Sequence, residues 1–196
     1  MATPLVDVTF NQQQLEALQR EFRAAPNKIN RIQAGAVNDT LKNLRTYVSQ
    51  ELRADLAVKA RDLKTRNLVV LQRANRFNPA AHLRVTGSRI PLKYFDVRQG
   101  KNVTSWKIYR AGPRKKARDV FFATMPSGHF GVFHRSATKK MQRKPRRAAI
   151  TEMYGPSVPY VANKIPSLSQ TALDAKVGAR LQANLDQRIR FELTKD

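Results

Sequence analysis

Residues 37–52 have the sequence VNDTLKNLRTYVSQEL, and this stretch sets the character of the N-terminal part of the chain. Its apolar residues recur at steps of four and three, at Val37, Leu41, Leu44, Val48 and Leu52. Such spacing puts all of them on one face of an α-helix. The stretch therefore predicts the core-facing part of a long amphipathic helix, for which Asn27 can serve as the N-cap.

Shorter helices are expected on both sides of this long helix. Thr9–Ala25 carries its apolar residues on one face and is followed by a proline. Lys59–Arg66 is expected to form a short basic helix. Near the C-terminus Ser169 can cap a final helix, in which apolar residues recur every four positions, at Leu173, Val177, Leu181, Leu185 and Ile189.

Between the helices the pattern changes to short β-type segments separated by turn residues such as Asn-Pro, Gln-Gly and Pro-Ser-Gly. The candidate strands are Leu68–Arg73, His82–Thr86, Pro91–Phe95, Val103–Arg110, Val120–Thr124 and Phe130–Phe133. The expected fold class is α+β: N-terminal amphipathic helices, a central antiparallel β-sheet with long basic loops, and a C-terminal helix.

The length of 196 residues suits a single α+β domain. We expect a helical part at 1–66, a β region at 67–135, a basic loop at 136–148, and a turn segment with the C-terminal helix at 149–196. The run Ser136–Arg147 has no acidic residue and a single large apolar one, so it cannot pack a core and is expected to be an exposed loop.

A second irregular segment, Tyr154–Pro159, contains two prolines and a glycine. Prolines fix the backbone, and glycine reaches conformations that other residues avoid. We expect this segment to be a turn that directs the chain from the β region into the last helix. Gly155 is expected to adopt a positive φ angle there.

The formal net charge of +23 is concentrated in the middle of the chain. Residues 63–148 hold 22 lysines and arginines against Asp96 and Asp119 alone, a net charge of +20, whereas the rest of the chain has a net charge of +3. A field of this size attracts either nucleic-acid phosphate or acidic protein. The candidate contact residues are Arg114, Lys115, Lys116, Arg118, Lys139, Lys140, Arg143, Lys144, Arg146 and Arg147.

Residue types that carry catalysis or bind metals are scarce. The chain has no cysteine, and its histidines, His82, His129 and His134, lie in or beside predicted strands without a metal-binding spacing. The β region has too few carboxylates for a metal-dependent nuclease. We therefore expect a non-enzymatic protein with no catalytic residues, no cofactor and no metal.

No stretch of the sequence has the length and apolar character of a membrane span, and the N-terminus lacks the pattern of a signal peptide. The expectation is a soluble protein made in the cytoplasm, without a membrane partner.

Two motifs carry a family resemblance. Residues 121–135 have the sequence FFATMPSGHFGVFHR, and after a basic stretch residues 150–159 have the sequence ITEMYGPSVP. Together with the helix entry at 29–31, they make the chain from about Pro26 to its end resemble the prophage minor tail protein Z family. The motif residues are Gly131, Val132, Phe133, Arg135, Gly155, Pro156 and Ser157.

The resemblance implies a tail-completion protein of a long-tailed bacteriophage, which acts at the head-tail junction so that tails can join DNA-filled heads. It implies assembly as a homo-oligomeric ring with other tail and neck proteins, such as the tail terminator, tube and connector. The expected location is the host cytoplasm during assembly, then the tail or neck of the virion. No catalytic residues come with the resemblance.

The basic region leaves two partners open, since its loops can contact genomic DNA without sequence preference or acidic faces of tail proteins. The alternative from another class is a nucleic-acid-binding module unrelated to phages, such as a ribosome-associated basic protein. Composition alone favours that alternative, and the paired motifs favour the tail protein.

Overall fold

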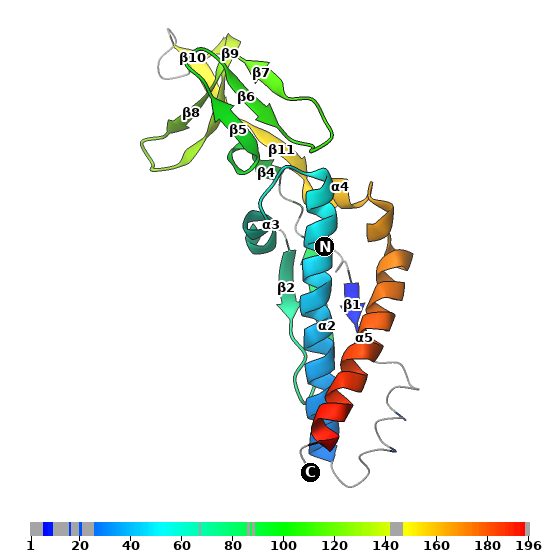
Figure 1. Ribbon diagram of the computed structural model, residues 1–196. Helices are drawn as coiled ribbons and strands as arrows, with labels where there is room; N and C mark the ends of the chain where they lie inside the picture. The colour runs from blue at the N-terminus through cyan, green and yellow to red at the C-terminus, as the bar shows by residue number, and fades with distance from the viewer. Residues whose placement is uncertain are drawn as a thin grey trace.

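The structure is a computed structural model that describes residues 6–9, 16, 20, 26–66, 68–85, 87, 89–141 and 147–194. The molecule is elongated, with a helical lobe at one end and a β lobe at the other (Figure 1). The helical lobe consists of two long helices and a small sheet, and the β lobe lies within residues 96–152. The helix expected at Thr9–Ala25 falls almost entirely outside the described residues.

Helix α2 (Pro26–Asp55) confirms the long amphipathic helix. All five residues of its apolar stripe are buried, with exposed fractions of 0 to 4%. Its N-terminus differs from the expectation, because Pro26 already belongs to the helix and Asn27 therefore lies in the first turn. Proline suits a first turn because that turn needs no backbone N–H donor.

Helix α5 (Gln170–Leu193) lies beside α2 and is capped as expected, with the hydroxyl of Ser169 accepting a hydrogen bond from the backbone N–H of Ala172 at 3.4 Å. Its residues Leu173, Val177, Leu181 and Leu185 are buried, and Ile189 is half-buried.

Polar side chains connect the two helices along their length. These contacts fix the position of one helix along the axis of the other. The connections are Arg188 to Asp39, Asn184 to Thr40, Lys176 over the ring of Tyr47, and Ser167, just before α5, to Glu51.

A small antiparallel sheet in the order β1-β3-β2 completes the helical lobe (Figure 1). Its strands are β1 (Val6–Val8), β2 (Leu68–Gln72) and β3 (Ala81–Val85), and α3 (Ala60–Arg66) precedes β2. The strands expected at 68–73 and 82–86 and the helix at 59–66 are confirmed to within about one residue, whereas β1 was not expected.

The strand expected at Pro91–Phe95 is wrong. Strand β4 (Arg89–Pro91) ends there, and the chain forms a 3₁₀ turn, η1 (Leu92–Tyr94). The turn buries both Leu92 and Phe95, and the backbone N–H of Leu92 donates to the carbonyl of Met153 rather than to a neighbouring strand of a hairpin. In such a turn, side chains three positions apart lie on the same side, which lets both of these residues face the core.

The first sheet of the β lobe has the order β5-β6-β7, with β5 (Asp96–Gln99), β6 (Thr104–Lys107) and β7 (Lys115–Ala117). The strand expected at Val103–Arg110 is shorter, because beyond Lys107 the chain leaves the sheet. There the carbonyl of Ile108 accepts a hydrogen bond from Ala57, so the segment binds the end of α2 instead.

The second sheet has the order β10-β9-β8. Strand β8 (Val120–Thr124) is as expected, but β9 (Phe130–Lys140) continues far beyond residue 133 and pairs with β10 (Ala148–Glu152). The exposed loop expected at Ser136–Arg147 is therefore a strand at 136–140, although residues 137–140 are exposed as expected. Lys140 pairs with Ala148 at the far end of this arm, beyond an irregularity in the register, and such backbone pairing does not require apolar side chains.

The turn expected at Tyr154–Pro159 is instead strand β11 (Tyr154–Ser157), paired with β4, followed by helix α4 (Val158–Ala162) and the turn η2 (Pro166–Leu168). Pro159 is accommodated in the first turn of α4. The positive φ expected at Gly155 is also wrong, since among the described glycines only Gly128, at 79°, has one.

The α+β class with antiparallel strands is confirmed, and the strands of the described residues are distributed over four small sheets. One apolar core runs through both lobes, from the stripe of α2 to Trp106, Val120 and Val132. Within the described residues, no helix has the length and apolar character needed to cross a membrane.

Candidate docking surface of the β lobe

The candidate contact residues that are exposed form two groups in the β lobe, one on each sheet. Lys115 and Lys116 lie on β7, the edge strand of the first sheet, and Arg118 follows it; all three are exposed. Lysines on an edge strand also discourage unwanted strand pairing, so this group has a structural use besides binding.

The second group lies at the far end of the β9–β10 hairpin. Lys139 and Lys140 end β9, Arg147 stands opposite, and all three are exposed. The backbone N–H of Met141 donates to the carbonyl of Arg147 at 3.0 Å, which holds the two arms together. The remaining candidates, Arg143, Lys144 and Arg146, lie outside the described residues.

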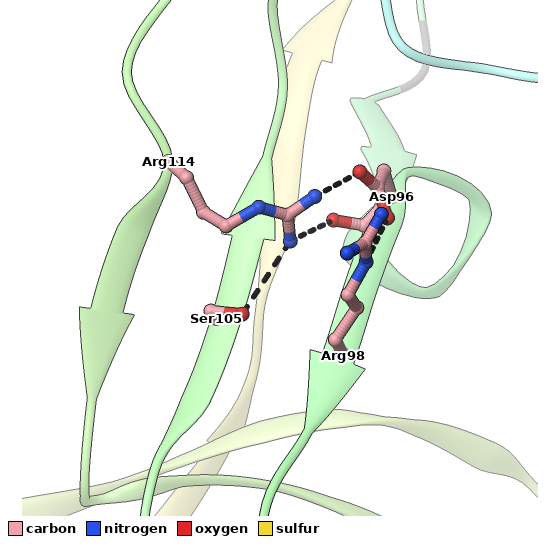
Figure 2. A network of polar contacts seen from close by, with 4 residues as sticks. All are labelled: Asp96, Arg98, Ser105 and Arg114. Carbon is pink, nitrogen blue, oxygen red and sulfur yellow. Dashed lines mark hydrogen bonds and ion pairs between the residues drawn. The ribbon is translucent and has the colours of Figure 1, made fainter.

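Arg114 differs from the other candidates because it is half-buried and already paired. Its guanidinium reaches over β6 and forms an ion pair with the carboxylate of Asp96 on β5 (Figure 2). It also donates to the hydroxyl of Ser105 at 3.4 Å and to the backbone carbonyl of Asp96 at 3.3 Å. Arg98 contacts the same carboxylate at 3.3 Å. Arg114 thus braces the sheet.

The motif Gly131-Val132-Phe133, called the GVF motif from here on, lies on β9, and its side chains point to both faces of the sheet. Val132 is fully buried in the core, and Phe133 is buried on the opposite face. A Cβ atom at Gly131 would lie 2.8 Å from the Oε1 atom of Glu152 and 3.1 Å from the ring of Phe133, so a side chain there would have to displace the end of Glu152. Arg135 is exposed, with its guanidinium 5.2 Å from the ring centroid of Phe121.

The motif Gly155-Pro156-Ser157, called the GPS motif from here on, has a packing role. A Cβ atom at Gly155 would lie 2.5 Å from the ring of Phe95, so this strand can approach the ring only with a glycine. Pro156 is half-buried. Ser157 is the N-cap residue of α4, but its hydroxyl makes no capping hydrogen bond.

A polar cluster that the sequence analysis did not assemble lies beside the GVF motif. The Oε2 atom of Glu152 accepts a hydrogen bond from the Tyr154 hydroxyl at 2.7 Å and lies 3.0 Å from Nε2 of His129. Lys93 donates to the carbonyl of Phe130. The sequence could have placed Glu152 beside this motif only if β10 had been recognised as a strand, because that strand pairs Glu152 with Phe133.

The cluster shifts the pKa values of two groups. Burial by itself would raise the pKa of Glu152, but the hydrogen bonds of Tyr154 and His129 and the charges of His129 and Lys93 outweigh burial and lower it. The hydrogen bond to this carboxylate raises the pKa of Tyr154. Glu152 is thus held as an anion between two donors, an arrangement that stabilises the fold.

The other histidines are not gathered into a site. His134, on the central strand β9, pairs with Asp119 just before β8, and His82 lies on β3 in the helical lobe. In the parts of the chain that the structure describes, no group of three or more histidine, aspartate or glutamate residues could hold a metal ion.

Comparison with protein-family models, curated proteins and solved structures finds no match for the chain. The candidate surface therefore rests on the chain's own residues. It consists of the cations on β7 and on the β9–β10 hairpin, from which Arg114 is withdrawn by its pairing with Asp96.

Proposed function

We propose that the chain is a structural assembly protein, a tail-completion subunit that acts at the head-tail junction of a long-tailed bacteriophage, and that it is not an enzyme. The observation that supports the proposal most is that the exposed cations and the long helices lie in different lobes of the molecule. Exposed cations stand on both sheets of the β lobe, while a long helical lobe with a continuous apolar core supports it.

The basic side chains of the two sheets suit docking rather than catalysis. They lie at edges and at a hairpin end, where they reach a partner without disturbing the core. A surface of one charge sign speeds encounter with an oppositely charged partner and helps to set its orientation. The resemblance of the GVF and GPS motifs to minor tail protein Z supports a tail or neck partner, such as the terminator, tube or connector.

The same cations would also suit genomic DNA passing through the junction, because contacts to phosphate do not depend on base sequence. A subunit of this kind would work as one of several copies in a ring, assembled in the host cytoplasm and retained in the virion neck.

Fractionation of the cell that makes the protein tests this proposal. After phage induction, the chain carrying a small epitope tag is followed across a density gradient that separates free tails, full particles and ribosomes. We expect the chain with completed tails and full particles. Recovery with ribosomes, or with nucleic acid in the absence of tails, would instead support the non-phage nucleic-acid-binding alternative.

A further inference from the structure

The two faces of the β8–β9–β10 sheet have different surroundings. Side chains alternate along a strand, so Val120 and Phe122 of β8 and Val132 of β9 face the core, while Phe121 of β8 and its partner Phe133 of β9 face the other way. The opposite face carries Phe121, Met125 and Ile150, which are half-buried and lie outside the hydrophobic core. This face is apolar, and no described element packs it into the core.

A hollow of about 550 Å³ lies on this face. Its apolar wall includes Phe121, Met125, Met141 and Ile150. Arg135 and Arg147 also line it, both are exposed, and none of the described residues that line it is a carboxylate. The hollow therefore combines an apolar floor with a positively charged rim.

The charge of the rim decides between possible occupants. A second copy stacked face to face would bring the arginines of both copies together, and like charges in close contact oppose association. Duplex DNA would satisfy the arginines but would present phosphates to an apolar floor. Stacking of an unpaired base is also disfavoured, because the guanidinium of Arg135 already covers the ring of Phe121.

We propose that this hollow binds a segment of a partner protein that carries apolar side chains next to carboxylates. The apolar side chains fill the floor, and the carboxylates pair with Arg135 and Arg147 at the rim. The inference rests on the proposed function and names the chemistry of the docking partner, so that the hollow itself takes protein rather than DNA.

Methionine methyl groups allow a direct test on the full chain. The sequence has four methionines, of which Met125 and Met141 line the hollow and Met153 lies elsewhere, packed against the core. The protein is labelled at its methionine methyl carbons and titrated with a short peptide that alternates leucine with glutamate. We expect the Met125 and Met141 signals to shift and the Met153 signal to stay in place.

Two matched charge reversals show where the peptide binds. The double change Arg135→Glu with Arg147→Glu should weaken binding at least about tenfold, since it turns attraction at the rim into repulsion. Arg31→Glu with Lys42→Glu makes the same change in net charge on helix α2, where both side chains are exposed, and should weaken it by less than about threefold. An unchanged Met153 signal in both variants shows that they fold.

Several results would overturn the inference. The first is that the Met125 and Met141 signals do not shift, and the second is that a peptide with lysine in place of glutamate binds equally well. The third is that duplex DNA shifts the same signals and the peptide competes with it. The fourth is that the signals shift with protein concentration alone, which would report self-association. If the peptide fails to bind but the purified protein still joins tails to heads, the hollow is not the docking site and the proposed function stands.

Discussion

Gly155 has no room for a side chain because the ring of Phe95 lies directly against its backbone. Changing Gly155 to Ala should cost about 1 to 3 kcal/mol of unfolding free energy, the usual range for overpacking a filled site. Urea denaturation measures this loss.

Gly178 provides the matched control, since a Cβ atom there meets nothing within 4 Å. Its change to Ala in the exposed part of α5 should stabilise the protein by up to about 1 kcal/mol, because alanine favours a helix over glycine. Equal effects of the two changes would show that Phe95 does not restrict Gly155.

The Glu152–Tyr154 hydrogen bond should make stability depend on pH. Because folding lowers the pKa of Glu152, its contribution is complete above the ordinary value near 4.5 and is lost as the pH falls through the lower folded value. Tyr154→Phe should therefore destabilise the protein at pH 6 and have a smaller effect in acid. Unfolding curves of both proteins at several pH values measure this, and a pH-independent difference would contradict it.

Folding raises the pKa of Tyr154, so its contribution is present below pH 10.0 and lost as the pH rises through the folded value. At alkaline pH, the unfolding free energy should accordingly fall less steeply with pH in Tyr154→Phe than in the unchanged protein, which the same set of unfolding curves measures.

Among the elements, the first sheet of the β lobe depends on a side chain that crosses it. Arg114→Ala should remove the brace between Arg114 and Asp96 and cost about 1 kcal/mol, a modest value because the ion pair is partly exposed to water. Arg118→Ala removes an equal charge from an exposed position and should change stability by less than about 0.5 kcal/mol. Urea denaturation distinguishes them, and equal stabilities would mean that Arg114 braces nothing.

The helices were predictable because their apolar residues recur at helical spacing, as in the stripe of α2 and at Leu173 to Leu185 of α5. Strand β8 was predictable because aromatic and β-branched residues fill it. The second half of β9 and all of β7 escaped prediction, since Lys115, Lys116 and Lys140 are held there by backbone pairing and not by burial.

The candidate site was only partly predictable for the same physical reason. Sequence identifies cations but not their partners, so Arg114 could not be separated from Lys115 before Asp96 was seen beside it. Likewise the closeness of Gly155 to Phe95 joins β11 to the end of η1, a contact between distant segments that no local pattern encodes.

For the whole molecule, the net charge of +23 should produce duplex DNA binding that weakens as salt rises. Contact with about five phosphates would give a log-log slope of about −4 to −5 against salt concentration. Changing Lys115, Lys116, Arg143 and Arg146 to Glu should flatten this slope and weaken binding equally for all sequences. Fluorescence anisotropy measures both effects, and a steep slope that survives the reversal would place the DNA contact elsewhere.

The joining of tails to DNA-filled heads tests the central claim most directly. Tails and heads are prepared from a phage that lacks the gene for this chain, the purified protein is added, and infectious particles are counted. We expect particles only when the protein is present, and far fewer when Lys115, Lys116, Arg143 and Arg146 are changed to Glu. The same yield of particles with and without the protein would contradict a tail-completion function.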